Sequence, residues 1–396
     1  MMNLLSIILI VSLLFISYTY LIYPWIVSLL ARGKQYTDKS YTLKELPNIA
    51  VVFAAYNEEK VIVNKLKNFD VLDYPSDKLT IHLGLDHPDD GTAQLIQENL
   101  PSRFPLLVHH FMKRGGKANV LNKLFNQKIE LADYDVIIMM DANIILSENC
   151  LLELVKYFKD PQIGLVGAVI KNTIDGAGEI AQQEQFYISK ESEIKVNEGL
   201  AFGATIGAFG ACYAIRPAYV KDIPSNFLME DFYLSLHVFE HGAQCITNPH
   251  AVVFEDLPGS IDEEFKRKRR ISTGNFQNLK AYKHLLWSNT WPVGFAFFSH
   301  KVLRWFTPFL LFMAIVSSTW LFVLYPSIQI YQILFALMIA NIFLPLVDLV
   351  LKAVNISVNL LRLHRYFLSM NIAMFLGFID WVRGVKTNIW KPTERL

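Results

Sequence analysis

The sequence predicts an α/β domain with a largely parallel sheet, in a chain that also contains α-helical transmembrane segments. Two observations support this prediction. Hydrophobic residues make up 53% of the 396 residues and charged residues 18%, against about 45 to 50% and about 25% in soluble domains, and the apolar excess is concentrated towards the two ends. Between these ends, short apolar runs alternate with helix-like segments, which is the pattern of strands and crossover helices.

Residues 1–31 contain no charged side chain and are predicted to be an N-terminal transmembrane anchor. A bilayer core needs about 20 helical residues, which Leu4–Tyr23 supplies, whereas buried helices of soluble proteins seldom exceed about 14 apolar residues. No basic residue precedes the run, unlike in a secretory signal peptide. Basic residues follow it, which places the next domain in the cytoplasm and the N-terminus outside; they are Arg32, Lys34, Lys39 and Lys44.

The body between residues 32 and 304 is predicted to contain five strands joined by helices. Ile49–Ala54 is continuously apolar, as expected of a strand covered on both faces. Ser147 followed by Glu148 indicates an N-cap and a first-turn acid. The other predicted strands are Thr80–Leu85, Leu106–Phe111, Val136–Met140 and Gly164–Ile170. The predicted helices are Glu58–Asn68, Thr92–Leu100, Lys117–Gln127 and Glu148–Phe158.

Residues 305–350 are predicted to form a transmembrane helical hairpin, because Trp305–Val347 is uncharged and Tyr325-Pro326-Ser327 supplies a turn. Lys301 and Arg304 before it and Lys352 after it keep both ends inside. Residues 351–396 are expected to contain an interfacial helix, a possible further span and a cytoplasmic tail. Whether Tyr366–Val382 spans the membrane stays open, because its uncharged part is short and a crossing would export Arg383 and Lys386.

Charge and cysteine content exclude some classes of function. The 37 basic and 36 acidic side chains leave a net charge of +1, so the chain lacks the basic field that gathers nucleic acid. Cys150, Cys212 and Cys245 are too few and too widely spaced for a disulfide framework or a zinc knuckle. They are expected to be reduced thiols of a domain that faces the cytosol.

Polar residues follow four of the predicted strands, where open α/β sheets bind their ligands. No Walker loop and no dinucleotide-binding glycine fingerprint is present. The four segments are Ala55-Tyr56-Asn57-Glu58-Glu59, Asp86–Thr92, Arg114-Gly115-Gly116-Lys117 and Asp141-Ala142-Asn143.

With these segments in this order, and Met229-Glu230-Asp231 after them, the sequence resembles the membrane-bound family 2 glycosyltransferases, relatives of the cellulose, chitin and hyaluronan synthases. The likeness extends to Trp390–Arg395. It implies a GT-A, Rossmann-like fold that binds a nucleotide diphosphate sugar. The implied donor contacts are Ala55, Tyr56, Asn57 and Glu58 at the base and ribose, Asp86 at the uracil with Asp90 in the same turn, Lys117 at the diphosphate, and Asp141 with Asn143 at a metal.

Asp141 ends an apolar strand, where an ionised carboxylate is costly unless a metal or hydrogen bonds offset its desolvation. Mg²⁺ or Mn²⁺ fits this position and would bridge diphosphate oxygens. The alternative is an Asp that caps the following helix. Asn143 stands where the resemblance leads us to expect an aspartate, so the site carries less charge. His250 is the histidine nearest to completing a metal shell, but we expect it to be a loop residue.

Lys117 follows two glycines, which let backbone approach phosphate closely at a helix start; alone, it would be read as a solvated surface residue. Glu58 and Glu59 are either ligand contacts or first-turn acids.

Glu230 and Asp231 open a helix among apolar residues, so burial would raise a carboxylate pKa towards that of a general base. Simple helix capping is the alternative. The resemblance assigns Asp231 as the base and Glu230 as its orienting neighbour.

The basic run Phe265–Arg270 is a solvated face, an anionic-lipid contact, or the family's Gln-x-x-Arg-Trp element. In the last case Arg270 would be the Arg that helps to close the donor site. Ile271 then stands at the Trp position and cannot stack on a growing chain. Phe276 is the residue that would replace it.

The sequence thus predicts an inverting hexosyl- or N-acetylhexosaminyltransferase of the plasma (inner) membrane, multi-pass, with its catalytic domain in the cytoplasm. The expected partners are a nucleotide diphosphate sugar, a lipid-linked or glycan acceptor and membrane lipids, with no nucleic acid. A UDP-sugar is favoured and GDP-mannose is the alternative donor. A processive polysaccharide synthase is the alternative within the family; a transporter or a non-catalytic sugar-nucleotide-binding subunit is the alternative from another class.

Overall fold

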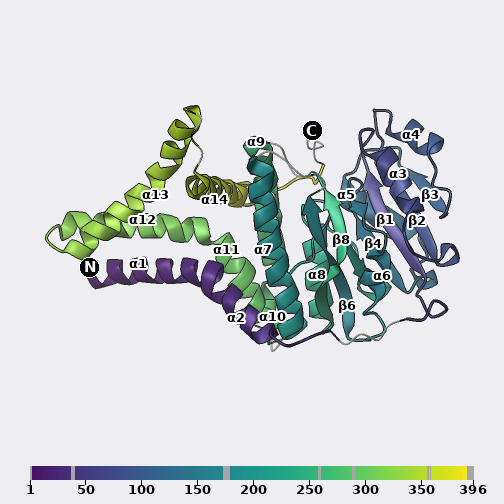
Figure 1. Cartoon of the computed structure of the whole chain (residues 1–396), viewed down its shortest axis with the longest axis horizontal. Coiled ribbons are helices and arrows are strands. Elements are labelled where there is room, and N and C mark those ends of the chain that lie inside the picture. The colour runs from purple at the N-terminus through teal and green to yellow at the C-terminus, as the bar shows by residue number, and fades with distance from the viewer. Residues whose placement is uncertain are drawn as a thin grey trace. The chain divides into compact units, whose positions relative to one another are not determined.

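The computed structural model describes residues 2–36, 41–172, 179–256, 260–287, 291–354, 356 and 358–389 (Figure 1). The chain folds as two compact units. Unit 1 consists of Met1–Ile26, Glu264–Phe276 and Phe297–Arg383, and unit 2 of Val27–Glu263, Gln277–Ala296 and Gly384–Leu396. Lys39 and Trp390–Arg395, which entered the sequence argument, lie outside the described residues.

Unit 2 is built on one eight-stranded sheet with the strand order β3-β2-β1-β4-β7-β6-β8-β5. Strands β1 to β4 pair in parallel, as do β6 and β8. β7 is antiparallel to β4 and β6, and β5 is antiparallel to β8, so the sheet is mixed. The bounds are β1 Ile49–Ala55, β2 Leu79–Leu85, β3 Leu106–His110, β4 Val136–Met140, β5 Ile145–Leu146, β6 Ile163–Asn172, β7 Cys212–Ile215 and β8 Gln244–Glu255.

The helices of unit 2 follow the predicted order but not all predicted bounds. α3 begins at Ile62, not at Glu58. The predicted N-cap Ser147 is wrong, because α6 begins at Cys150 after Asn149, and Ser147 instead accepts the Cys150 N–H through its backbone carbonyl. The bounds are α3 Ile62–Asp70, α4 Thr92–Glu98, α5 Lys117–Gln127, α6 Cys150–Val155, α7 Glu179–Phe202, α8 Glu230–Glu240 and α10 Val293–Ala296, with short 3₁₀ turns at Ser76–Lys78, Leu131–Asp133, Pro217–Tyr219 and Lys283–Leu286. α9 (Ile261–Tyr282) belongs to unit 2 at its two ends and to unit 1 over Glu264–Phe276.

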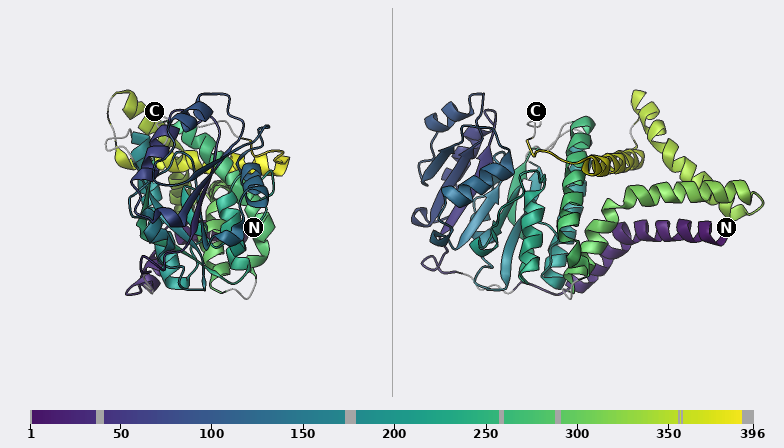
Figure 2. Two further views of the ribbon diagram at one scale, coloured as in Figure 1. Left: turned by 90° about the vertical axis from the view of Figure 1, so that its right-hand side faces the viewer. Right: turned by 180° about the vertical axis from the view of Figure 1, so that it is seen from behind.

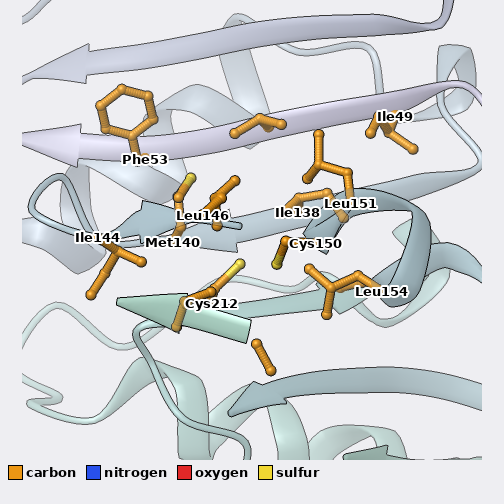
Figure 3. Packing of buried hydrophobic residues seen from close by; sticks show 14 of the residues in the cluster. Ile49, Phe53, Ile138, Met140, Ile144, Leu146, Cys150, Leu151, Leu154 and Cys212 are labelled. Carbon is orange, nitrogen blue, oxygen red and sulfur yellow. The ribbon is translucent and has the colours of Figure 1, made fainter. Parts of the chain in front are cut away.

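Helices cover the sheet on both faces, which is why its strands are apolar throughout. On β1, Ile49 and Phe53 belong to a core that also contains Leu151 and Leu154 of α6 (Figure 3). On the opposite face of β2, Gly84 lies against α5, where a Cβ would come within 2.4 Å of Val120. The three cysteines are buried and free in this interior, and Cys150 of α6 and Cys212 of β7 face the same core.

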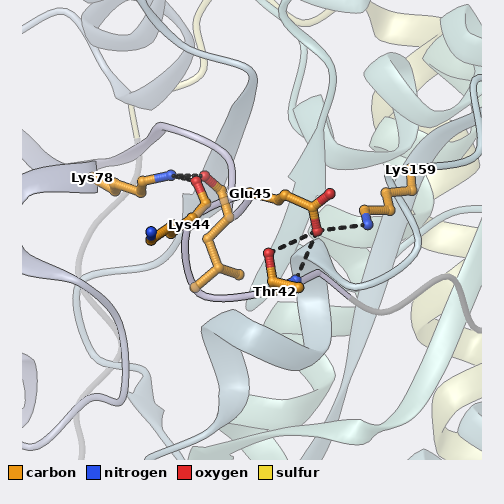
Figure 4. Close-up of polar contacts among 6 residues, drawn as sticks. Thr42, Lys44, Glu45, Lys78 and Lys159 are labelled. Atoms are coloured by element: carbon orange, nitrogen blue, oxygen red, sulfur yellow. Dashed lines mark hydrogen bonds and ion pairs between the residues drawn. The ribbon is translucent and has the colours of Figure 1, made fainter.

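The segment before β1 is attached to unit 2 by polar contacts (Figure 4). One carboxylate oxygen of Glu45 accepts from Thr42 Oγ1 at 2.9 Å, from the Thr42 backbone N–H at 3.0 Å and from Lys159 Nζ at 3.0 Å. Lys78 Nζ donates to the backbone carbonyl of Lys44 at 2.7 Å. The chain that leaves the N-terminal helix is therefore fixed to the sheet domain before β1 begins.

Three helices are long and apolar enough to cross a membrane: Met2–Ala31, Thr307–Leu324 and Gln329–Ala353. The first comprises α1 Met2–Ser17, a π-helical turn Tyr18–Ile22 and α2 Tyr23–Ala31. In unit 1, α1 lies beside α12 (Thr307–Leu324), as Figure 1 and the right-hand view of Figure 2 show. Leu9, Ala314 and Leu321 form the buried centre of their contact. α12 ends at Tyr325 and α13 (Gln329–Ala353) begins after Ile328, so the predicted turn is present.

α14 (Asn359–Arg383) follows α13 and continues without a break through Tyr366. α14 is not among the described helices that are apolar enough to span a membrane. Its Arg365 pairs with Asp348 of α13, with Nε 2.6 Å from Oδ2, although the two groups are not oriented as a hydrogen bond. Near the other end, Asp380 accepts two hydrogen bonds from Arg269 of α9, at 2.5 and 2.7 Å.

Phe276 lies in the aromatic interior of unit 1 and is only 2% exposed. Its ring packs edge-on against Phe378 at a centroid distance of 5.0 Å and lies 5.7 Å from Trp381. A ring held in this way does not offer a face to a sugar, so the expectation that Phe276 replaces the missing Trp is wrong.

Candidate active site

The predicted metal, diphosphate and base residues meet in unit 2 around the Lys117 side chain. Asp141 follows the last residue of β4, Lys117 is the first residue of α5, and Glu230 is the first residue of α8. The Lys117 ammonium contacts both Asp141 Oδ1 and Glu230 Oε1. Asp231 is the next residue on α8 and is 6% exposed. Three elements that are distant in sequence thus bring one cation and three carboxylates together.

Burial and charge shift the pKa values of this cluster in opposite directions. Burial disfavours the Lys117 ammonium, but the carboxylates of Asp141 and Glu230 outweigh it and raise the pKa of Lys117 above its ordinary value. For Asp231, burial and the nearby Glu230 charge raise the pKa to about 6. Lys117 is therefore a permanent cation near neutral pH, and Asp231 is a carboxylate with raised proton affinity.

The loop before β7 passes directly over Asp231. A Cβ on Gly210 would come 2.9 Å from Asp231 Oδ2, so a larger residue here would displace that carboxylate. The loop is tied to α8 because the Ala208 N–H donates to Ser235 Oγ at 3.1 Å, and Ser235 Oγ donates to the Asp231 carbonyl at 2.7 Å. These contacts fix the backbone around the carboxylate.

Asp141 and Asn143 offer the oxygen ligands that hard divalent cations prefer. The Asp141 side chain is 37% exposed, and its Oδ1 is paired with Lys117. Asn143 has a buried amide nitrogen with no hydrogen-bond partner in the described part of the chain. A carboxylate oxygen and an amide oxygen fit Mg²⁺ or Mn²⁺. Within the described ranges, no cluster of three or more His, Cys or acidic side chains includes Asp141.

Asp86 holds the turn that leads into α5. Its two carboxylate oxygens accept the backbone N–H groups of Gly115 at 2.7 Å and Gly116 at 2.8 Å, and the side chain is 2% exposed. Gly116 has φ +83°, a left-handed conformation that favours glycine. Both amides of the glycine pair are thus bonded within the protein, and the turn fixes the start of α5, where Lys117 lies.

Ala55 is the last residue of β1, Tyr56, Asn57 and Glu58 lie in the loop after it, and Asp90 lies in the loop after β2. Asn57 and Asp89 exchange hydrogen bonds, and the Glu58 N–H donates to Thr92 Oγ1 at 2.8 Å. Asp90 accepts the N–H groups of Thr92 at 3.0 Å and Glu59 at 3.3 Å. The structure gives Asp90 and Asn57 a clear role in joining the loops, and their predicted contacts with nucleotide stay predictions.

Tyr213 and Asn388 gave no signal in the sequence, and Arg114 was noted only as part of a polar segment. The Arg114 guanidinium lies 3.6 Å from the ring centre of Tyr56. Tyr213 of β7 is buried, its hydroxyl has no partner among the described residues, and burial raises its pKa well above the ordinary value. Asn388 is 4% exposed and, with its amide oriented to suit its neighbours, accepts the Ala118 N–H at 3.1 Å. Only the folded chain brings these residues to the strand ends.

Two predicted residues are not part of this cluster. Arg270 is an exposed residue of α9 in unit 1, so its role at the donor site stays a prediction. His250 lies in β8 and not in a loop, which corrects the sequence expectation, and it is exposed.

Comparison with solved structures supports the fold. A mannosyltransferase from Pyrobaculum calidifontis, solved in complex with GDP-Man and Mn²⁺, matches over 95% of this chain and 99% of its own, with a TM-score of 0.72 and 19% sequence identity. At this identity the likeness concerns the fold. The predicted GT-A-type, Rossmann-like α/β domain, together with helices apolar enough to span a membrane, is confirmed.

Similar sequences point in the same direction. Poly-β-1,6-N-acetyl-D-glucosamine synthase of Staphylococcus aureus is 28% identical over 59% of this chain, and the match spans 56% of that enzyme's length. A probable glycosyltransferase of Bacillus subtilis is 24% identical over 71% of this chain and 67% of its own. The family described as glycosyl transferase family group 2 matches residues 136–347, more than half of the chain. The protein is therefore a member of glycosyl transferase family group 2.

Proposed function

We propose that the protein is an inverting glycosyltransferase that moves a sugar from a nucleotide diphosphate sugar to a lipid-linked or membrane-held glycan acceptor. The observation that carries the proposal is the cluster of Lys117, Asp141, Glu230 and Asp231 at the carboxyl end of β4 and the starts of α5 and α8. It combines a cation for a leaving diphosphate with a carboxylate of raised pKa for an acceptor proton.

Asp231 acts as the general base in this proposal. An acceptor hydroxyl attacks the anomeric carbon of the donor sugar, its proton passes to Asp231, and the bond between that carbon and the diphosphate oxygen breaks with its electron pair leaving on the diphosphate. One displacement of this kind inverts the anomeric centre. A pKa of about 6 for Asp231 suits the task, because a base near the working pH accepts a proton most effectively.

Lys117 stabilises the charge that develops on the departing nucleoside diphosphate. Its side chain is 17% exposed, and its ammonium is held in position by Asp141 and Glu230, with which a bound diphosphate would compete. Asp141 and Asn143 would hold Mg²⁺ or Mn²⁺, which when bound neutralises diphosphate charge. Asp86 contributes by keeping the Gly115-Gly116 turn, and therefore Lys117, in place.

The acceptor and donor are proposed from the relatives. The name of the staphylococcal relatives favours an N-acetylglucosamine donor, which we propose to be UDP-linked. It also supports the second candidate, a processive synthase of the same family. The Pyrobaculum mannosyltransferase was solved with GDP-Man, so GDP-mannose is the second donor to be tested.

We also propose that the protein is a multi-pass protein of the plasma (inner) membrane, with residues 32–304 as the cytoplasmic catalytic domain. The support is the three apolar helices together with the basic residues after the first of them. Residues 1–31 would be the anchor, 305–350 the hairpin, and 351–396 an interfacial helix and tail. Placing the site beside the membrane would give it access to a lipid-linked acceptor.

The test uses the purified full chain in lipid nanodiscs, with a membrane lipid extract as the acceptor source. UDP-N-acetylglucosamine, UDP-glucose and GDP-mannose, each labelled in the sugar, are supplied in turn with Mg²⁺ or Mn²⁺. We expect one donor to give both nucleoside diphosphate release and transfer of label to the lipid fraction. A transporter or a non-catalytic subunit would give neither.

The matched control compares Asp231→Asn with Asp222→Asn. Asp222 is an exposed aspartate of the same unit that accepts a hydrogen bond from Asn126 at 2.7 Å and lies outside the cluster. Loss of transfer in the first variant alone supports the proposal. Equal transfer by both variants would move the base elsewhere, and no turnover of any donor by the wild-type protein would overturn the proposed activity.

A further inference from the structure

The far end of α8 carries a second group of ligand-type side chains that the proposed reaction does not use. His237, Glu240 and His241 are spaced three and four residues apart, which places them on one face of the last turn. Each of the three offers one ligand atom, and these atoms all lie within 4.8 Å of one another, which is close enough to surround a metal ion. Among the described residues, they are the group of three or more His, Cys or acidic side chains that lies so close together. His237 is buried, whereas Glu240 and His241 are exposed.

The distances fit a small metal after minor side-chain rotation. A tetrahedral Zn²⁺ site with nitrogen ligands at about 2.0 to 2.1 Å has ligand atoms about 3.3 Å apart. His237 Nδ1 already lies 3.1 Å from Glu240 Oε2, in a hydrogen bond that the metal would replace as it displaces the Nδ1 proton. The other distances between ligand atoms are within 4.8 Å and involve the exposed side chains of Glu240 and His241, which can rotate at little cost. The buried His237 would supply the fixed ligand and the other two would close on it.

Two further contacts resemble the outer support of known metal sites. His241 Nδ1 lies 3.0 Å from the backbone carbonyl of His237, which can only accept, so Nδ1 carries the proton and Nε2 is left with its lone pair for a metal. His284 Nε2 lies 3.1 Å from Glu240 Oε1 and holds that carboxylate from outside α8. Metal-bound histidines and carboxylates are usually oriented by such partners.

The local charge favours a cation on balance. The cluster lies at the C-terminal end of α8, where the helix dipole is negative, and Glu240 supplies a full negative charge. Lys221 opposes binding, because its Nζ lies 3.9 Å from Glu240 Oε2. That distance is long for an ion pair, and the ammonium is also held over the rings of Tyr233 and Tyr282. Removal of the Lys221 charge should therefore strengthen metal binding.

We propose that His237, Glu240 and His241 bind a structural Zn²⁺ ion, with a water as the fourth ligand and His284 as the positioning residue for Glu240. Imidazole and carboxylate ligands in a tetrahedral arrangement suit zinc. The ion would fasten the end of α8 whose first residues are Glu230 and Asp231, and link it through Glu240 to the turn Lys283–Leu286. The site is separate from Asp141 and does not depend on the proposed reaction.

The test measures zinc binding by the full chain in detergent, purified through a tag that contains no histidine and stripped with a chelator. Titration with Zn²⁺ against a chromophoric chelator should give about one ion per chain, and Co²⁺ in its place should give the visible absorption of a tetrahedral site. His241→Gln should weaken Zn²⁺ binding about 100-fold or more, and His284→Gln about 10-fold, as expected for a ligand and for a supporting partner. Lys221→Met should tighten it several-fold.

Two controls locate the ion. His250→Gln removes an exposed histidine of β8, and Asp141→Asn alters the donor-site carboxylate; both should bind Zn²⁺ as the wild type does, and millimolar Mg²⁺ should not displace it. Zn²⁺ should also raise the unfolding temperature of the wild type but not of His241→Gln. Absence of stoichiometric binding, or equal affinity in the wild type and His241→Gln, would overturn the proposal.

Discussion

Lys117 is the residue that links the parts of the candidate site. It contacts one carboxylate from the end of β4 and one from the start of α8, and its own helix begins at the turn held by Asp86. A donor diphosphate that binds Lys117 would compete with these two carboxylates for the same ammonium. Donor binding would then free Asp141 for a metal and leave Glu230 beside Asp231, which couples the donor half of the site to the base.

The first prediction concerns Asp231. Asp231→Asn keeps the size and hydrogen bonding of the side chain but cannot accept a proton, so kcat should fall by about 10²- to 10⁴-fold. The Kd for the nucleoside diphosphate should change little, because the proposed donor contacts lie elsewhere. Steady-state kinetics and calorimetry on the purified variant measure the two quantities. A large loss of nucleotide affinity would show instead that Asp231 supports the donor site.

The second prediction concerns pH. The base must be deprotonated, so kcat/KM should fall as the pH drops through about 6, the raised pKa of Asp231. Glu230 contributes to that raised pKa through its negative charge, although burial contributes more. Glu230→Gln removes the charge and keeps the burial, so the acid limb should move to lower pH without disappearing. An unchanged limb in this variant would assign it to a different group.

The turn before α5 is the element whose backbone the site depends on most. Gly115 and Gly116 could be read from the sequence as a phosphate-binding pair, but their N–H groups are bonded to Asp86. A pair of glycines indicates that the backbone needs freedom there, and it does not reveal which acceptor the amides will find. Asp86 is 30 residues from Gly116 in the chain, and the parallel pairing of β2 with β3 brings the two close.

The third prediction tests that turn. Gly116→Ala forces a residue with a Cβ into φ +83°, which costs roughly 1 to 2 kcal/mol, and places the Cβ 2.1 Å from the side-chain amide of Asn388. The turn should shift and carry Lys117 with it, so KM for the donor should rise about 10-fold or more. Gly242→Ala is the control, since its φ of +75° is similar and nothing lies within 4 Å of the added Cβ. It should lower the unfolding temperature and leave KM unchanged.

Elements with a single clear pattern were predictable from the sequence, and elements with mixed patterns were not. Val136–Met140 is a continuous apolar run and is found as β4 with the predicted bounds. β8 was missed because Asn248-Pro249-His250 interrupts its apolar run. α7 was missed because Glu184, Lys195 and Glu198 are buried polar residues that disrupt an apolar periodicity. β7 has four residues, too few to display a period. The same holds at the site, where Tyr213 and Asn388 carry no motif.

At the scale of the whole molecule, the orientation of the chain in the membrane decides which substrates reach the site. The fourth prediction places a single cysteine at Lys44, an exposed residue of unit 2, or at Ser327, in the turn between α12 and α13. The three native cysteines are buried and give little background. A membrane-impermeant thiol reagent should label Ser327→Cys in intact cells and Lys44→Cys only after the cells are opened. The reverse pattern would place the catalytic domain outside.

The fifth prediction concerns the size of the product, on which the residues and the relatives disagree. The relatives of known product are polymer synthases, and such enzymes can guide a growing chain by stacking its sugars on an aromatic ring. In this chain the corresponding position of α9 is Ile271, and Phe276 is enclosed by Trp305, Phe378 and Trp381. With neither residue able to stack on a sugar, we expect one sugar or a few to be added to a membrane-held acceptor.

Labelled product from the purified protein should therefore elute at low mass in gel filtration after lipid release. The Ile271→Trp variant, which restores the aromatic face, should lengthen the product if that face is what is missing. A high-mass polymer made by the wild-type protein alone would instead establish the processive synthase.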